Sequence, residues 1–293
     1  MSPFNSGINL YQSQINTTES KINLFNTNIL KLSGHFNDSI SQNKTVKVDQ
    51  FINNTIEVHT SVITPVGSLK NRLTVWRLIT DNQYILDIVE NGYKIPFKTE
   101  PEQIYINNNK SSLENKDFVA SEIINLLNKE CIREVSTKSL IVNPLTVAFS
   151  KSSKPRLVLD CRHINPHLHK YRFIYEDGKV AREMFDVGDF IFSYDLISVY
   201  HHIEIFEEHE HYLGLAWFFD GKIRYFVFAV LSFGISTTGY IFSKVLREVV
   251  KDFRSKGKRI IMFLDDGLAG ENDYDTAVKS SREVNDQLQN LGF

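Results

Sequence analysis

The sequence has few cysteines, no strong excess of charge and no long apolar run, and each shortage excludes a class of protein. Its two cysteines, Cys131 and Cys161, form neither a Cys-x-x-Cys pair nor a disulfide framework, so they indicate a reducing compartment. No apolar run reaches the roughly 18 residues that a membrane helix needs. The N-terminus also lacks a secretion signal. We therefore expect an intracellular protein, of the cytoplasm or the nucleus, that is neither secreted nor held in a membrane.

The formal net charge of -2 excludes a chain whose whole surface attracts nucleic acid. The charge is unevenly distributed, however, because residues 138–172 contain seven basic residues and one acid, Asp160. A basic strip of this kind suits phosphate-bearing substrates, although an ordinary solvated surface gives the same pattern. The strip is a weak indication of phosphate binding.

Three regions follow from composition and periodicity. Residues 1–65 are rich in Asn, Ser and Thr, and they predict a low-complexity, disordered region. Residues 66–115 predict a short segment with a helix that stops at Gly92, and residues 116–293 predict the main domain. Within the main domain, helices are expected over 117–129, 236–256 and 275–291, and strands over 132–135, 140–149, 156–160, 190–196, 212–219, 222–230 and 259–264. Pro144 is expected to place the strand 140–149 on an edge or at a bend. Strands and helices mix without strict alternation, which predicts the α+β class.

The main domain is organised around the stretch 259–270, where a short apolar strand precedes Asp265 and Asp266. Gly267 is expected to form the tight turn of a hairpin. Burial of two adjacent carboxylates is costly, and a divalent cation shared with a third carboxylate would relieve it, although a plain polar turn has the same sequence. Asp195, at the end of another strand, is the expected third acid. Alternation along the strand favours Asp265 as the main partner of Asp195, with Asp266 as a helper.

Four blocks in this order resemble a reverse transcriptase, most closely those of DIRS-type and gypsy-type retroelements. The blocks are Lys154-Pro-Arg-Leu-Val-Leu-Asp-Cys-Arg-His-Ile-Asn165, Asp195-Leu-Ile-Ser-Val-Tyr-His-His-Ile203, Leu231-Ser-Phe-Gly-Ile-Ser-Thr237 and Phe263-Leu-Asp-Asp-Gly-Leu268. The resemblance covers residues 117–293 and, more loosely, residues 69–97. It implies a polymerase palm, an antiparallel sheet backed by helices, together with elements of the fingers.

The resemblance also implies the metal chemistry. Asp195, Asp265 and Asp266 match the catalytic aspartates of the family, and with Leu196 they are the expected ligands of two Mg²⁺ ions, for which Mn²⁺ is a possible substitute. Such ions act on both the attacking and the leaving oxygen in phosphoryl transfer. The nearby histidines match no zinc-binding spacing.

The expected nucleotide-binding residues are implied in the same way. Arg156, assisted by Lys154, matches the arginine that contacts the incoming triphosphate. Tyr200 matches the aromatic residue against the nucleotide sugar, where a ring would crowd a 2′-hydroxyl. Phe233 and Gly234 match the loop beside the nascent base pair. Each has a plainer interpretation, as a core ring, an ordinary turn or a surface cation.

The expected function is therefore RNA-directed DNA synthesis from deoxynucleotides on a primed RNA or DNA template. Four residues depart from the family pattern, namely Ile197, Ser232 and the pair Thr238-Gly239. The chain also ends before the next palm motif, so a fingers-palm portion truncated before the thumb is expected, with residues 66–115 as a pre-polymerase segment. Two alternatives remain open: a non-catalytic retroelement remnant that only binds nucleic acid, and another palm enzyme such as an RNA-templated RNA polymerase or a nucleotide cyclase.

Overall fold

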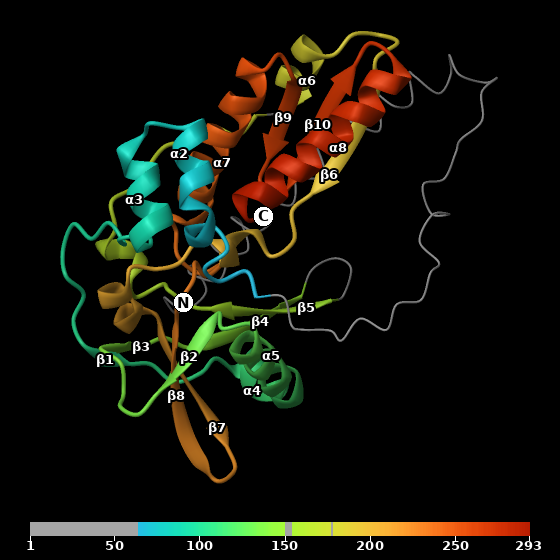
Figure 1. Ribbon diagram of the computed structural model, residues 1–293. Coiled ribbons are helices and arrows are strands. Elements are labelled where there is room, and N and C mark those ends of the chain that lie inside the picture. The colour runs from blue at the N-terminus through green and yellow to red at the C-terminus, as the bar shows by residue number, and fades with distance from the viewer. Residues whose placement is uncertain (1–63, 150–153, 177) are drawn as a thin grey trace, which may run out of the picture.

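The computed structural model describes residues 64–149, 154–176 and 178–293. The expected low-complexity region 1–65 therefore lies, except for Thr64 and Pro65, outside the described residues. The described chain mixes helices with three β-sheets, as the α+β prediction requires (Figure 1). None of its described helices is long and apolar enough to cross a membrane.

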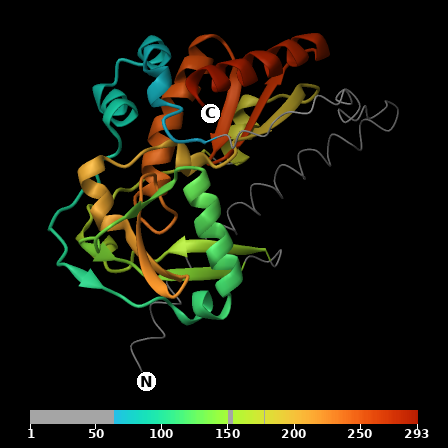
Figure 2. The ribbon, with the colours of Figure 1, turned by 60° about the horizontal axis from the view of Figure 1, so that its bottom comes forward.

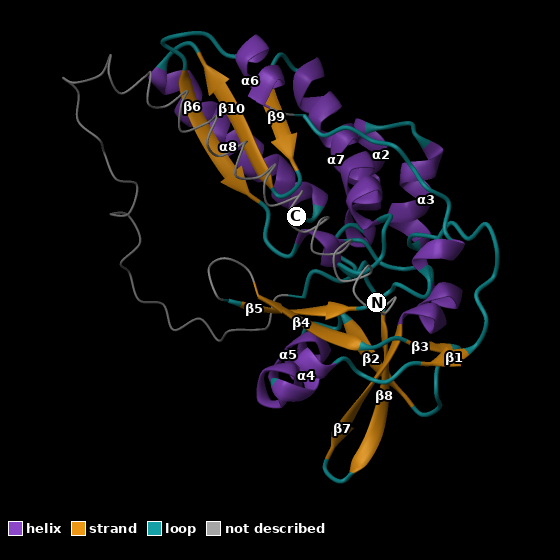
Figure 3. Ribbon diagram, turned by 180° about the vertical axis from the view of Figure 1, so that it is seen from behind, coloured by secondary structure: helices purple, strands orange, loops and turns teal. Residues whose placement is uncertain are grey.

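The first sheet is antiparallel and has three strands. In order across the sheet these are β6 (Phe190–Asp195), β10 (Asp266–Glu271) and β9 (Arg259–Phe263). Three helices pack against it: α6 (Gly178–Met184), α7 (Thr238–Ser255) and α8 (Tyr274–Leu291). Figure 3 shows the three strands side by side with α8 running along them. Helices α7 and α8 each begin and end within two residues of the predicted bounds.

The second sheet has five strands and lies with the two-stranded sheet in the other half of the molecule (Figure 2). Its strands are, in order, β1 (Ile104–Tyr105), β3 (Ile141–Val142), β7 (Gly214–Phe219), β8 (Lys222–Phe228) and β2 (Ile132–Val135). The two-stranded sheet consists of β4 (Leu145–Phe149) and β5 (Pro155–Leu159). Helices α4 (Lys110–Glu114) and α5 (Lys116–Asn128) pack against β4 and β2 respectively. The predicted hairpin at Asp220-Gly221 is confirmed, and both turn residues have positive φ.

The segment 140–149 does not form one continuous strand, and it divides at Pro144, where the sequence predicts an edge or a bend. The segment forms β3 and β4, which belong to different sheets. Between them, the Asn143 side chain donates hydrogen bonds to the carbonyl oxygens of Tyr212 and Gly214. Pro144 has no N–H to give to a ladder, and its carbonyl accepts from the Asp160 N–H instead. The chain therefore changes sheets at this proline.

The N-terminal helices pack on the three-stranded half of the molecule. They are η2 (Lys70–Arg72), α2 (Leu73–Ile79) and α3 (Gln83–Asn91). Three further 3₁₀ helices lie later in the described chain: η3 (Asn165–His167), η4 (Val199–His202) and η5 (Glu207–Leu213). Trp76 of α2 is fully buried, and its Nε1 donates to the Leu291 carbonyl over 3.0 Å. Helix α3 stops at Gly92, where φ is +86°, as the sequence predicts. Residues 66–115 thus share one hydrophobic core with the main domain.

Candidate active site

The β9–β10 hairpin turns at Leu264 and Asp265, and not at Gly267 as the sequence suggested. Leu264 has a φ of +55°, a left-handed conformation that is strained for a leucine. Gly267 lies within β10, where a Cβ atom would stand 2.0 Å from the Tyr194 ring. The glycine therefore leaves room for Tyr194, while Leu264 adopts the unusual backbone conformation of the turn.

Strand pairing brings the three acids together at one end of the sheet. Asp195, the last residue of β6, is the direct cross-strand partner of Asp266. The Leu196 N–H donates to the Asp265 carbonyl over 2.9 Å, so Asp195 and Asp266 form a non-hydrogen-bonded pair. Side chains of such a pair share one face, with Cβ atoms about 4.5–5.5 Å apart. Alternation along the strand therefore does not favour Asp265 over Asp266 as the main partner of Asp195. Asp265 lies in the turn, and Asp266 directly opposes Asp195.

The electrostatics of this cluster oppose ionisation. Burial raises the pKa of Asp265, the charge of Asp195 raises it further, and Arg156 lowers it. Burial also raises the pKa of Asp266, with contributions from Asp265 and Asp195. Asp195 is exposed and the other two acids are half-buried. The cluster therefore carries negative charge that the surrounding protein compensates only in part.

The donor set at this end of the sheet suits a hard divalent cation. Its ligands would be carboxylate oxygens and the backbone carbonyl of Leu196, whose side chain is buried. Among the residues that the structure describes, no three His, Cys, Asp or Glu side chains already stand as a metal-binding group.

Arg156 is an exposed cation on β5 whose charge reaches Asp265. Its alternative partner, Asp160, instead pairs with Arg162 and accepts from Asn109 over 3.0 Å. No carboxylate in the described part of the chain forms an ion pair with Arg156. Lys154, directly before β5, is exposed as well. Arg156 is thus available to an anion that approaches the aspartates.

Tyr200 packs against the loop of Phe233 and lies within electrostatic reach of Asp265. Its ring lies edge-on to Phe233 at 5.0 Å and to Phe242 at 5.3 Å between centroids. Burial raises its pKa, with smaller contributions from Tyr175 and Asp265. Two perpendicular rings fix the orientation of this tyrosine.

Gly234 lies against the backbone of β5. A Cβ atom at this position would stand 1.7 Å from the Leu159 carbonyl oxygen, so only glycine permits the contact. Asn165, for which the sequence predicts no role, binds the loop that carries Phe233 and Gly234. Its side chain donates to the Gly234 carbonyl over 3.0 Å and accepts from the Ser236 N–H over 2.9 Å. The position of Asn165 at the end of the first block was the available signal.

The glycine at position 239 also has a packing reason. A Cβ atom there would lie 2.6 Å from the Tyr175 hydroxyl oxygen. The Tyr175 ring also packs against Phe263, the last residue of β9, with 5.0 Å between centroids. Gly239 therefore lets Tyr175 bridge the first turn of α7 and the aspartate hairpin.

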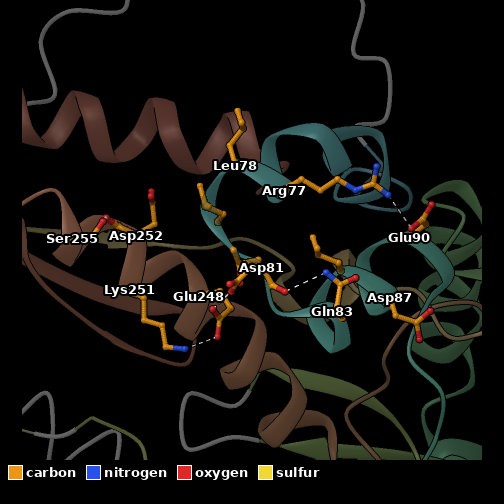
Figure 4. A pocket seen from close by; sticks show the side chains of 13 residues that line it. Arg77, Leu78, Asp81, Gln83, Asp87, Glu90, Glu248, Lys251, Asp252 and Ser255 are labelled. Atoms are coloured by element: carbon orange, nitrogen blue, oxygen red, sulfur yellow. Dashed lines mark hydrogen bonds and ion pairs between the residues drawn. The ribbon is translucent and has the colours of Figure 1, made fainter.

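A hollow of about 970 Å³ lies elsewhere, between α2, α3 and α7 (Figure 4). Its charged lining residues are largely paired, Arg77 with Glu90 at 3.3 Å and Lys251 with Glu248 at 2.8 Å. None of the predicted site residues lines it. The candidate site is therefore the end of the three-stranded sheet and not this hollow.

No protein-family model matches the chain, and no curated protein matches it either.

Proposed function

We propose that this chain is the fingers-palm portion of an RNA-directed DNA polymerase, similar to the reverse transcriptases of DIRS-type and gypsy-type retroelements. The observation that carries the proposal is the register in which Asp195 opposes Asp266 and Leu196 bonds to Asp265. The cation of Arg156 within electrostatic reach of Asp265 adds support. In this proposal the three-stranded sheet with α7 and α8 is the palm, and the other two sheets with α4 and α5 belong to the fingers.

The aspartates would hold the metal. Asp195, Asp265 and Asp266 supply carboxylate oxygens, and Leu196 supplies its carbonyl. Two Mg²⁺ ions held there, or Mn²⁺ in their place, would supply charge stabilisation for attack of a primer 3′-hydroxyl on the α-phosphate of a deoxynucleotide. Burial is the main cause of the raised pKa values of Asp265 and Asp266, and the neighbouring carboxylates raise them further; a bound cation would offset this repulsion.

The other residues would bind and orient the nucleotide. The Arg156 guanidinium presents a planar set of donors that fits phosphate oxygens, and Lys154 adds a second charge. Tyr200 cannot turn away from the sugar easily, because Phe233 and Phe242 hold its ring. A fixed ring there would reject a 2′-hydroxyl and so favour deoxynucleotides.

Primer extension on an RNA template tests the proposal. The purified chain is given deoxynucleotides or ribonucleotides, in Mg²⁺ or in Mn²⁺. We expect incorporation of deoxynucleotides, and its loss in the double variant Asp265→Asn, Asp266→Asn. Asp220→Asn is the matched control, because it makes the same chemical change at an exposed turn of the β7–β8 hairpin. This control should keep full activity.

Two outcomes would contradict the proposal. Incorporation that survives in the double variant would mean that another protein or another site does the chemistry. Absence of incorporation by the unaltered chain would favour the non-catalytic alternative, in which the chain only binds nucleic acid. A preference for ribonucleotides would instead favour an RNA-templated RNA polymerase.

A further inference from the structure

The two residues that follow Leu196 form a turn with little support from their own side chains. Ile197 is 81% exposed. Ser198 has a φ of +56°, a left-handed conformation that is strained for a residue other than glycine. Its side chain caps none of the described N–H groups of η4, although its carbonyl accepts from the His201 N–H over 2.8 Å. Contacts from elsewhere in the fold must therefore help to stabilise this turn.

His202, the last residue of η4, binds the turn through its imidazole ring. Its Nε2 lies 3.1 Å from the Ile197 carbonyl oxygen. Because a carbonyl oxygen only accepts, Nε2 carries the proton and donates it. Burial lowers the pKa of His202, so the ring is neutral at pH 7 and Nδ1 is an acceptor. The ring thus fixes the orientation of the Ile197 carbonyl, and its Nδ1 requires a donor.

That donor is Ser68, which lies 134 residues earlier in the chain. Its Oγ atom is 3.0 Å from His202 Nδ1 and 2.6 Å from the Pro65 carbonyl oxygen. The hydroxyl has one proton for these two acceptors, and they share it. Ser68 belongs to residues 64–69, which we call the N-terminal strap. The histidine of η4 is therefore supported by a segment that lies outside the four blocks of the resemblance.

The N-terminal strap is anchored on both sides. Thr64 donates from its Oγ1 to the Lys129 carbonyl, directly after α5, over 2.6 Å. Leu69 is buried in the main core. The Ser68 carbonyl oxygen lies so close to Gly292, which ends α8, that a Cβ atom there would stand 2.4 Å from it. The strap therefore contacts α5 and α8, which pack against different sheets, and Ser68 is held between them.

We propose that His202 is a positioning residue, supported by Ser68, that holds the turn after Leu196 in the conformation on which metal binding at the aspartates depends. Asp195 and the Leu196 carbonyl lie directly before this turn, so a turn that relaxes from its strained conformation displaces both groups. The N-terminal strap thereby sets the metal affinity of the candidate site. This effect on metal binding rests on the proposed function, whereas the fixing of the turn by His202 does not.

Amide hydrogen exchange on the whole chain, followed by NMR without metal, measures the turn itself. The reporter is the His201 N–H, because its bond to the Ser198 carbonyl exists only while the turn is formed. We expect His202→Leu and Ser68→Ala to speed exchange at this N–H by about two- to tenfold, the effect of one hydrogen bond. His202→Gln should recover most of the protection, since its amide can still donate to the Ile197 carbonyl.

Two matched controls separate this effect from a general loss of stability. The His209 N–H donates to the Phe206 carbonyl at the start of η5, the same pattern in another 3₁₀ helix, and its exchange should not change. Ser281→Ala is the control for Ser68→Ala, because the Ser281 hydroxyl also donates to the carbonyl three residues before it, that of Val278, over 2.8 Å. This variant should leave exchange of the His201 N–H unchanged.

Binding of Mn²⁺ to the whole chain is then measured from the electron paramagnetic resonance signal of the free ion. We expect His202→Leu and Ser68→Ala to weaken Mn²⁺ binding by about two- to tenfold, in step with the faster exchange. His202→Gln should weaken it less than His202→Leu does. Ser281→Ala should bind Mn²⁺ as the unaltered chain does.

The proposal is overturned if the His201 N–H exchanges in both variants as it does in the unaltered chain, or if exchange of the His209 N–H rises equally. It is also overturned if both variants bind Mn²⁺ as tightly as the unaltered chain. If the unaltered chain binds no Mn²⁺, the proposed function fails, while the exchange rates still decide whether His202 fixes the turn. Failure of primer extension alone, with Mn²⁺ bound, leaves this inference intact.

Discussion

Replacement of Gly234 by alanine should separate β5 from the loop that carries Phe233. The new Cβ atom would stand 1.7 Å from the Leu159 carbonyl oxygen and 3.0 Å from the Cys161 sulfur. The carbonyl belongs to the backbone and cannot rotate away as a side-chain tip can. The strand or the loop must therefore move by about 1 Å or more, since close-packed interiors do not absorb such overlaps.

The expected cost of Gly234→Ala follows from this overlap. Overpacking of a core contact typically costs about 1–3 kcal/mol. For a chain of this size, that should lower the melting temperature by about 3–10 °C. The displaced strand also carries Arg156, and misplacement of a binding group by 1 Å can cost about 100-fold in rate. Nucleotide incorporation per bound template should therefore fall by about two orders of magnitude.

Thermal unfolding and single-nucleotide incorporation measure the two effects of Gly234→Ala. Gly270→Ala is the matched control, because a Cβ there meets only side-chain atoms, the nearest in the Phe185 ring at 3.0 Å, and a side chain can turn. We expect the control to change the melting temperature by no more than about 2 °C, equivalent to less than 1 kcal/mol. If Gly234→Ala unfolds and incorporates nucleotide like the unaltered chain, the argument from the close contact is refuted.

Three further predictions concern the same region. Without divalent ions, the contribution of Asp265 to the unfolding free energy should be lost as pH rises from about 4 through its raised pKa, since the folded state holds that proton more tightly. The difference in unfolding free energy between the unaltered chain and Asp265→Asn should therefore decline over this pH range in denaturant titrations, and the variant should lose any Mg²⁺-dependent gain in melting temperature; a difference that stays constant with pH would refute the raised pKa of Asp265. Asn165→Ala should cost about 1–3 kcal/mol, because it removes the side-chain bonds to the Gly234 carbonyl and from the Ser236 N–H, and should raise the nucleotide KM more than Asn165→Asp, which keeps the bond from Ser236. Gly239→Ala should destabilise the chain by about 1–3 kcal/mol, because its Cβ atom would overlap the Tyr175 hydroxyl. Adding Tyr175→Phe to this variant should recover part of the lost stability; if it does not, the overlap with the hydroxyl is not the cause.

Local pattern was enough to predict much of the secondary structure. The apolar stripes of α5, α7 and α8 repeat at helical spacing, and Gly92 stops α3 where the sequence indicates. The dipeptide Asp220-Gly221 fixes the β7–β8 hairpin. These signals depend on residues within a few positions of one another, so they can be recognised from the sequence alone. The single strand expected over 140–149 is divided because its first half, β3, pairs with β1 and β7, which are distant in the sequence, whereas its second half, β4, pairs with the neighbouring β5.

The sequence by itself determined that acids follow apolar strands at Asp195 and at Asp265-Asp266. Only the tertiary structure decided that β6 pairs with β10 in the register that sets Asp195 opposite Asp266, since pairing between distant strands depends on the packing of the whole core. It also decided why Gly234 and Gly239 are glycines. Neither has a positive φ, so the reason lies in the neighbour each one contacts, the Leu159 carbonyl and the Tyr175 hydroxyl, which the sequence places more than 60 residues away.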